Sequence, residues 1–226
     1  MRIKRGSGLA IGLTVGLCLV IGLSGCFKSQ NYLPPDAEEE IRRAFTLWDR
    51  GQRQEAIQSF KSTMDMHNSD RWRSFAAYSI SQIYDELGDR VASNAAMDDA
   101  KRFGAPSYQA TAGMCYSDLG FYEDARRELR QAIKSGLGAR RRVAVIYELA
   151  RVCTELNYFD EAQSNFERIL SPDFPKAYAG YALLYERMGN YSNAREMWRQ
   201  YLEHDPNGEF ADMAREHTGG LGHGGQ

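Results

Sequence analysis

The sequence predicts an all-α protein, a solenoid of about five stacked helical hairpins, and three observations carry this prediction. First, a small or turn-forming residue recurs in steps of 37, 32, 37 and 32 residues, at Gly51, Gly88, Gly120, Asn157 and Gly189. Second, apolar residues recur three and four apart on both sides of these positions, which is the spacing of amphipathic helices. Third, three further columns of residues keep the same steps, and columns that stay in register over five units indicate a repeat.

The columns also predict how each hairpin packs. The first helix must end at the turn residue, because glycine and asparagine adopt a left-handed backbone at low cost. Five positions later a small residue marks the place where two helices cross closely: Ala56, Ser93, Ala125, Ala162 and Ala194. Four positions further a bulky residue fills the seam: Phe60, Met97, Leu129, Phe166 and Trp198. The third column precedes the turn by four positions: Leu47, Tyr84, Tyr116, Cys153 and Tyr185. Each hairpin keeps one apolar flank that only a neighbouring hairpin can bury, so the units must stack.

The repeat is expected to cover residues 37–206. Its five units span about 37–70, 71–105, 106–138, 139–173 and 174–206. Residues 26–36 precede it as a tether, and residues 207–217 are long enough for a short helix that caps the last apolar face. Residues 218–226 have five glycines among their last eight positions and are expected to be a disordered tail.

Residues 1–25 read as a signal peptide. A basic start, MRIKR, precedes an apolar run of 15 residues over 9–23, which is shorter than the roughly 20 residues a spanning helix needs. The sequence LSGC at 23–26 resembles the lipobox of bacterial lipoproteins, which implies cleavage between Gly25 and Cys26 and acylation of Cys26, palmitate among the lipids. Phe27 stands where an aspartate would favour the inner membrane, so the resemblance favours the outer membrane, facing the periplasm. The alternative is an ordinary secretory signal or an uncleaved anchor in which Cys26 is incidental.

Two units carry the repeat pattern most fully. The pattern is an aromatic residue, a glycine, a second aromatic residue, an alanine and a bulky residue. In the third unit these are Tyr116, Gly120, Tyr122, Ala125 and Leu129, and in the fifth they are Tyr185, Gly189, Tyr191, Ala194 and Trp198. Pro206 closes the fifth unit. The pattern resembles the tetratricopeptide repeat (TPR). The first two units depart from it, with Arg53 and Arg90 in place of the second aromatic residue and Ser93 in place of alanine. The resemblance implies a right-handed solenoid whose first helices line a concave groove that holds a partner's peptide or helix.

The register assigns residues to that expected groove. They are Tyr78, Gln82, Asp85, Met114, Ser117, Asp118, Tyr147, Arg151, Glu155, Leu183, Glu186 and Arg187. Tyr147 and Arg151 lie one helical turn apart, and an aromatic residue beside an arginine is a good anchor for a peptide carboxylate or side chain. The alternative is that these are ordinary solvated residues on an unused face.

A second candidate surface is basic. If Ala125 and Leu129 face the core, then Arg126, Arg130 and Lys134 form an outward stripe that could meet lipid phosphates or an acidic partner. The alternative is a merely solvated helix face.

Composition and motifs exclude several function classes. The net charge of the chain is −2, and loss of Arg2, Lys4 and Arg5 with the signal peptide leaves 25 basic residues against 30 acidic ones, so nucleic acid is not an expected partner. No catalytic or cofactor motif occurs, and the four histidines suggest no metal site, so no enzyme and no cofactor are expected. Cys115 and Cys153 fall in apolar helical stretches, which favours buried free thiols over a disulfide.

The sequence thus predicts a non-catalytic scaffold or adaptor lipoprotein of the bacterial cell envelope. Lipoproteins of this build resemble the pilotins of type IV pilus secretins, the repeat-bearing accessory of the outer-membrane protein assembly complex, and adaptors for peptidoglycan enzymes. The alternative is a lipid- or peptidoglycan-associated adaptor that uses the basic stripe.

Overall fold

The computed structural model describes residues 35–66 and 68–219, so the predicted signal peptide, Gly25 and Cys26 lie outside the described residues. These residues form eleven α-helices and no strand. The helices are α1 (Pro35–Asp49), α2 (Arg53–Met66), α3 (Asp70–Leu87), α4 (Arg90–Phe103), α5 (Tyr108–Asp118), α6 (Tyr122–Lys134), α7 (Ala139–Glu155), α8 (Phe159–Glu167), α9 (Lys176–Arg187), α10 (Tyr191–His204) and α11 (Ala211–Gly219).

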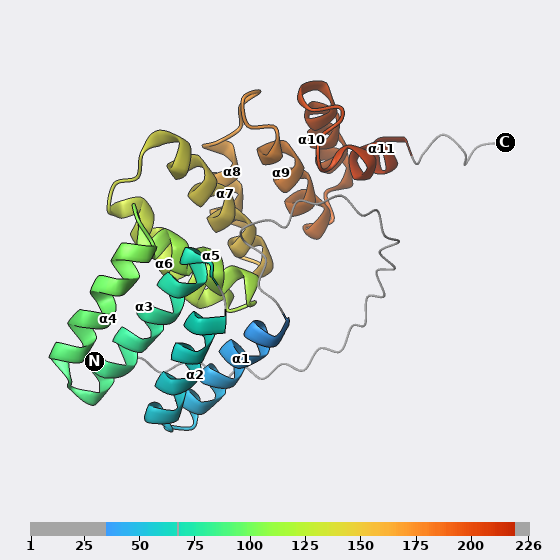
Figure 1. Ribbon diagram of the computed structural model, residues 1–226. Coiled ribbons are helices and arrows are strands. Elements are labelled where there is room, and N and C mark those ends of the chain that lie inside the picture. The colour runs from blue at the N-terminus through green and yellow to red at the C-terminus, as the bar shows by residue number, and fades with distance from the viewer. Residues whose placement is uncertain (1–34, 67, 220–226) are drawn as a thin grey trace. The chain divides into compact units, whose positions relative to one another are not determined.

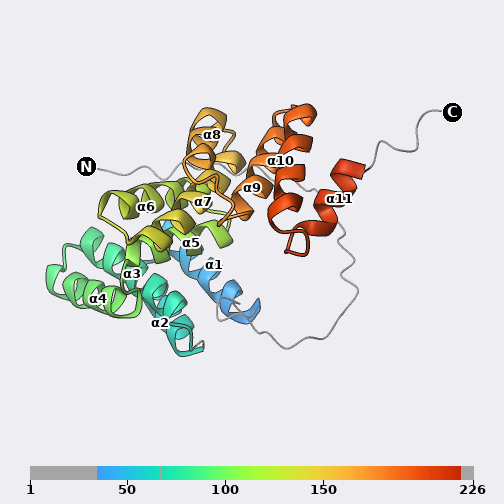
Figure 2. The ribbon, with the colours of Figure 1, turned by 90° about the horizontal axis from the view of Figure 1, so that it is seen from above.

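Successive helices pair as five hairpins, α1 with α2 through α9 with α10, which follow one another in chain order (Figures 1 and 2). The second hairpin packs on the first through α2 and α3, and from there on the first helices of neighbouring hairpins meet: α3 packs on α5, and α7 packs on both α5 and α9. The predicted all-α solenoid of five hairpins is therefore confirmed.

The turns inside the hairpins have the backbone conformation that the sequence predicts. All five turn residues have a positive φ, which is +79° at Gly120 and +60° at Asn157. At the third turn the amide of Gly120 donates to the carbonyl of Ser117, and the amide of Phe121 donates to that of Tyr116 at 2.8 Å. These bonds satisfy carbonyls that the end of a helix leaves unpaired, so the left-handed residue both ends α5 and reverses the chain.

Close helix crossings occur where the column of small residues predicts them. Ala56, Ala125 and Ala162 are 0% exposed. Two glycines outside the columns mark further close approaches: a Cβ on Gly113 would lie 2.6 Å from Cγ of Leu129, and one on Gly180 would lie 2.6 Å from the ring of Phe166. These distances are shorter than real Cβ contacts, so each glycine leaves room for a side chain of the facing helix.

The buried apolar side chains form a core that runs from α1 to α9 and a smaller one shared by α9, α10 and α11. In the smaller one, Ala211 and Ala214 of α11 pack with Trp198 and Tyr201 of α10, so α11 covers the apolar end of the last hairpin. The capping helix was predicted at 207–217, but α11 begins at Ala211 and takes in the first two residues of the predicted tail, 218 and 219. At the other end α1 begins at Pro35, two residues inside the predicted tether. The rest of the tether and the tail lie outside the described residues.

Candidate functional site

The first helices of the hairpins carry the residues predicted to line a groove, but the structure does not place them all at a surface. Tyr78 on α3 is only 8% exposed, and its ring packs against that of Tyr108 with centroids 5.5 Å apart. Burial, together with the neighbouring Glu128, raises the pKa of Tyr78. The prediction that Tyr78 lines the groove is therefore wrong, because this face of α3 is covered by the next hairpin.

Five polar side chains on α3, α5 and α7 form two neighbouring hydrogen-bonded groups, which together we call the polar cluster. Its members are Arg71, Ser117, Asp118, Glu148 and Arg151. Nη2 of Arg71 lies 2.6 Å from a carboxylate oxygen of Asp118. The hydroxyl of Ser117 donates to Glu148 at 2.6 Å, and Nη1 of Arg151 donates to the other oxygen of Glu148 at 2.9 Å. Burial raises the pKa of the Asp118 carboxyl, an effect that the adjacent Arg71 opposes.

The polar cluster holds Arg151 in place while leaving it accessible. The side chain of Glu148 is 13% exposed, whereas that of Arg151 is 52% exposed. The hydrogen bond from Nη1 to Glu148 favours the rotamers of Arg151 that keep it. Arg151 therefore presents the remaining donors of its guanidinium group at the surface.

Tyr147, one helical turn before Arg151, is fixed in a different way. Its ring makes edge contacts with Phe166 and Phe174, at centroid distances of 6.0 and 5.6 Å. Burial raises the pKa of Tyr147 to about 12. Its ring is partly buried, so it is a rigid support beside Arg151 rather than a freely projecting anchor.

The other predicted groove residues divide into two groups. Gln82 accepts a long hydrogen bond of 3.5 Å from the Tyr116 hydroxyl, Met114 packs on the core, and Leu183 is 37% exposed. Glu186 and Arg187 instead hold elements together.

Glu186 accepts a hydrogen bond from the indole of Trp198 at 2.7 Å and lies 2.6 Å from Nδ1 of His217, which ties α9 to α10 and α11. Arg187 bonds to Glu155 at 2.9 Å and to the side chain of Asn157 at 3.1 Å, which ties the fourth hairpin to the fifth. These two residues therefore act as links between helices, unlike Arg151.

The predicted basic stripe also takes part in packing. Glu161 of α8 accepts a hydrogen bond from Arg126 at 2.6 Å and forms an ion pair with Arg130, whose Nε lies 2.8 Å away. The guanidinium group of Arg126 lies 4.4 Å from the ring centre of Tyr158. The side chain of Arg126 is only 23% exposed. The prediction of an outward stripe is wrong for Arg126, because α8 lies against this face of α6. Among the described residues, only Lys134 of the three makes no ion pair.

Sequence reasoning missed Arg71 and Glu148, the two largely buried members of the polar cluster. Arg71 meets Asp118 across 47 residues of sequence, and Glu148 meets Ser117 across 31. The repeat columns could have indicated that these helices are neighbours, but the columns record packing residues and leave the polar positions between them unspecified.

The two cysteines are free and buried. Burial is the main cause that raises the pKa of each thiol to about 12, so neither is a ready nucleophile. Within residues 35–66 and 68–219, no group of three or more metal-binding side chains comes together. No helix in this part of the chain is both long and apolar enough to cross a bilayer.

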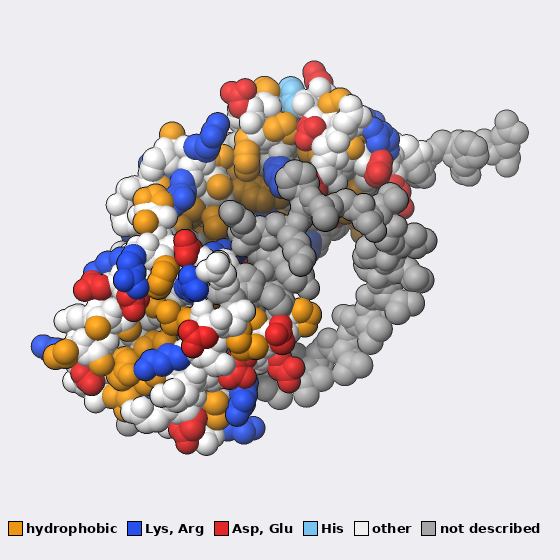
Figure 3. Space-filling view, in the orientation of Figure 1, with side chains coloured by type: hydrophobic (Ala, Val, Ile, Leu, Met, Phe, Trp, Pro, Cys, Tyr) orange, Lys and Arg blue, Asp and Glu red, His pale blue; other side chains and the backbone are white. Residues whose placement is uncertain are grey.

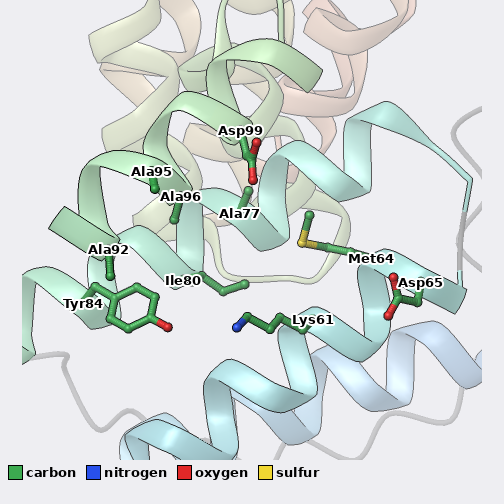
Figure 4. A pocket seen from close by; sticks show the side chains of 10 residues that line it. All are labelled: Lys61, Met64, Asp65, Ala77, Ile80, Tyr84, Ala92, Ala95, Ala96 and Asp99. Atoms are coloured by element: carbon green, nitrogen blue, oxygen red, sulfur yellow. The ribbon is translucent and has the colours of Figure 1, made fainter. Parts of the chain in front are cut away.

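A groove opens between α2 and α4, over α3, and we call it the α2–α4 groove (Figure 4). It has a volume of about 430 Å³ and is lined by Lys61, Met64, Asp65, Ala77, Ile80, Tyr84, Ala92, Ala95, Ala96 and Asp99. Apolar side chains gather on the surface over these helices (Figure 3). None of the predicted groove residues lines it.

Comparison with known proteins identifies one repeat by sequence. Residues 175–207, which contain α9 and α10, match the family described as tetratricopeptide repeat. No curated protein matches the chain.

Among solved structures, YrrB, described as a TPR protein with an unusual peptide-binding site, is 18% identical, with 80% of this chain and 92% of that chain covered and a TM-score of 0.46. A TPR protein from Parabacteroides merdae is 17% identical, with 82% and 75% covered and a TM-score of 0.45. PilW, described as a type IV pilus biogenesis factor, is 13% identical, with 84% and 89% covered and a TM-score of 0.47.

Proposed function

We propose that the protein, whose fold is a solenoid of tetratricopeptide-type hairpins, is a scaffold that binds a peptide or helix of a partner protein at the polar cluster. The observation that carries the proposal is the fixed pair of Tyr147 and Arg151. Arg151 is half exposed yet held by Glu148, and Tyr147 is wedged between Phe166 and Phe174.

Such a site binds at low entropic cost. Ordering a flexible arginine on binding costs about 0.5 to 1.5 kcal/mol, and Glu148 has restricted this side chain already. The free donors of the guanidinium group match a carboxylate, and the exposed oxygens of Asp118 can accept from a peptide amide or a basic side chain. The chemistry favours a partner segment that presents an acidic group beside a donor.

The proposed place of action is the periplasmic face of the bacterial outer membrane. The support is the signal-like segment 1–25 and the lipobox-like LSGC ending at Cys26. Two or more acyl chains give stable anchoring, and the eight residues 27–34 that precede α1 reach at most about 29 Å. A scaffold held this close to the bilayer suits an envelope assembly such as a type IV pilus secretin, in a pilotin-like role, or the outer-membrane protein assembly complex.

The test is a crosslinked pull-down from detergent-solubilised envelopes with matched variants. Replacing Tyr147 by alanine would empty the space between two phenylalanine rings, so the informative variants are Arg151→Gln and Tyr147→Phe, which keep the packing. The control is Arg199→Gln, because Arg199 is also an exposed arginine paired with a glutamate three residues away, but on the second helix of its hairpin.

A dominant partner that Arg151→Gln loses and Arg199→Gln retains supports the proposal, and its identity names the assembly. Equal capture by native protein and Arg151→Gln overturns the polar cluster as the binding site. The alternative lipid- or peptidoglycan-associated role has less support, since Arg126 and Arg130 are already paired with Glu161. Vesicle binding abolished by Lys134→Gln would revive it.

A further inference from the structure

The α2–α4 groove has a counterpart elsewhere in the molecule. A shift of 69 residues carries the first two units onto the third and fourth, and it carries Lys61 to Arg130, Ile80 to Leu149 and Ala92 to Glu161. Arg130, Leu149 and Glu161 line a smaller groove of about 300 Å³ between α6 and α8. The two grooves are therefore the same inter-repeat space with different side chains in it.

In the α6–α8 groove an ion pair joins the two helices. Arg130 of α6 reaches across to Glu161 of α8 at 2.8 Å. In the α2–α4 groove Lys61 has the position of Arg130, but Ala92 has the position of Glu161. Among the described residues Lys61 makes no ion pair. The first two units therefore have the cation of this pair without its carboxylate.

The wall opposite Lys61 carries three alanines of α4 and Asp99, a carboxylate that pairs with Arg102 at 2.8 Å. Ala92, Ala95 and Ala96 lie three and four residues apart, on one face of α4, and the shift carries Ala95 and Ala96 to the polar Ser164 and Asn165. Lys61 extends from α2 across the groove towards Ile80 and Tyr84 (Figure 4). Small side chains at this spacing allow another helix backbone to approach closely, as between packed helices.

From these observations we propose that the α2–α4 groove binds an amphipathic helix of a partner protein, with its apolar face on the alanines of α4 and a carboxylate paired with Lys61. The partner's carboxylate takes the place that Glu161 fills in the α6–α8 groove. Asp65, one turn beyond Lys61 on α2 and without an ion pair among the described residues, offers a matching contact for a basic side chain. This site shares no residue with the polar cluster, so it does not depend on the function proposed there.

The test uses the full chain in detergent micelles and three fluorescent 15-residue helical peptides. Each peptide has one face of alanine and leucine, an outer face of glutamine and serine, and a single central residue at the edge of the apolar face: glutamate, glutamine or lysine. Fluorescence anisotropy measures their affinities. We expect the glutamate peptide to bind about threefold to fivefold more tightly than the glutamine peptide, the upper part of the range for a partly exposed ion pair.

Three variants separate this site from general hydrophobic binding. Lys61→Glu should reverse the order so that the lysine peptide binds best. Ala92→Glu should rebuild the internal ion pair and remove the preference for the glutamate peptide. Ala95→Trp should fill the groove and weaken binding of the glutamate peptide by about tenfold or more. Circular dichroism checks that each variant keeps its helicity. If Ala95→Trp unfolds the chain, Ala92→Glu still tests the proposal.

Two results with the native chain would overturn the proposal that the α2–α4 groove binds a partner helix. They are equal affinities for the three peptides, and no saturable binding of the glutamate peptide. Glutamate-peptide binding that Ala92→Glu leaves unchanged would overturn it too. Sedimentation that shows a dimer of the native chain, lost in Ala92→Glu, would assign the groove to a second copy of the protein instead.

Discussion

Ser117 of α5 donates a hydrogen bond of 2.6 Å to Glu148 of α7, and this bond joins the third hairpin to the fourth at a site where the sequence shows no motif. Glu148 then holds Arg151, so a serine on one repeat sets the direction of an arginine on the next. The carboxylate of Glu148 is largely buried, so it needs the hydrogen bonds from both Ser117 and Arg151. The bond therefore contributes to the stacking of the repeats and also to the preparation of the proposed binding surface.

Replacing Ser117 by alanine should destabilise the protein by about 1 to 3 kcal/mol, because it leaves a largely buried carboxylate oxygen without its donor. Urea denaturation followed by circular dichroism measures the change. The matched control is Ser192→Ala at an exposed position on α10, which should alter the free energy of unfolding by no more than about 0.5 kcal/mol. Identical losses for the two variants would mean that the Ser117 bond adds nothing to stability.

Replacing Ala125 or Ala162 by leucine should cost about 1 to 3 kcal/mol, because each is fully buried at a helix crossing and a larger side chain must push the helices apart. Thermal and urea unfolding curves report the cost. Ala139→Leu, at an exposed position in the first turn of α7, is the control and should be nearly neutral. An unchanged unfolding midpoint for Ala125→Leu would contradict the packing register described above.

Cys115 and Cys153 should be inert towards thiol reagents in the folded protein at pH 8 and react fully in urea. Burial excludes the reagent and raises the pKa of both thiols to about 12 from the usual 9.0. A double variant, Cys18→Ser with Cys26→Ser, leaves Cys115 and Cys153 as the two thiols that the reagent can label. Rapid labelling of the native protein would show that one of them is accessible.

The same thiols predict a loss of stability at high pH. Their pKa is higher in the folded state than in the unfolded state, so the unfolded chain releases its protons first as the pH rises. The free energy of unfolding should therefore fall between about pH 9 and pH 12. Replacing both cysteines by alanine should make that part of the profile less steep, and the slope that remains is expected from Tyr78 and Tyr147, whose pKa burial also raises. An unchanged slope would assign the whole loss to groups other than the thiols.

Replacing Cys26 by serine should release the protein from envelope membranes into the soluble fraction, because a serine cannot carry the thioether-linked lipid. Fractionation with immunoblotting measures the distribution. Cys18→Ser is the matched control, since it changes a cysteine of the same segment that lies before the expected cleavage site and should leave the protein in membranes. Membrane retention of both variants would overturn the lipoprotein proposal.

The sequence by itself determined the architecture. The repeated turn residue of each hairpin predicted five positions with a left-handed backbone. The small residues five positions later predicted the close helix crossings at Ala56, Ala125 and Ala162. These features are local or repeat at a fixed step, so each can be read from a short window. The same reasoning located α9 and α10 well, where the pattern is most complete.

Only the tertiary structure decided which polar residues are available. Arg126 and Arg151 look alike in sequence, as exposed arginines on amphipathic helices, yet Arg126 is bound to Glu161 on another repeat and Arg151 remains half exposed. Tyr78 was expected at a surface and is buried, while the α2–α4 groove was not foreseen. The physical reason is that the rotation between neighbouring hairpins sets which side chains meet across 30 or more residues, and the repeat columns fix the spacing of the hairpins without fixing that rotation.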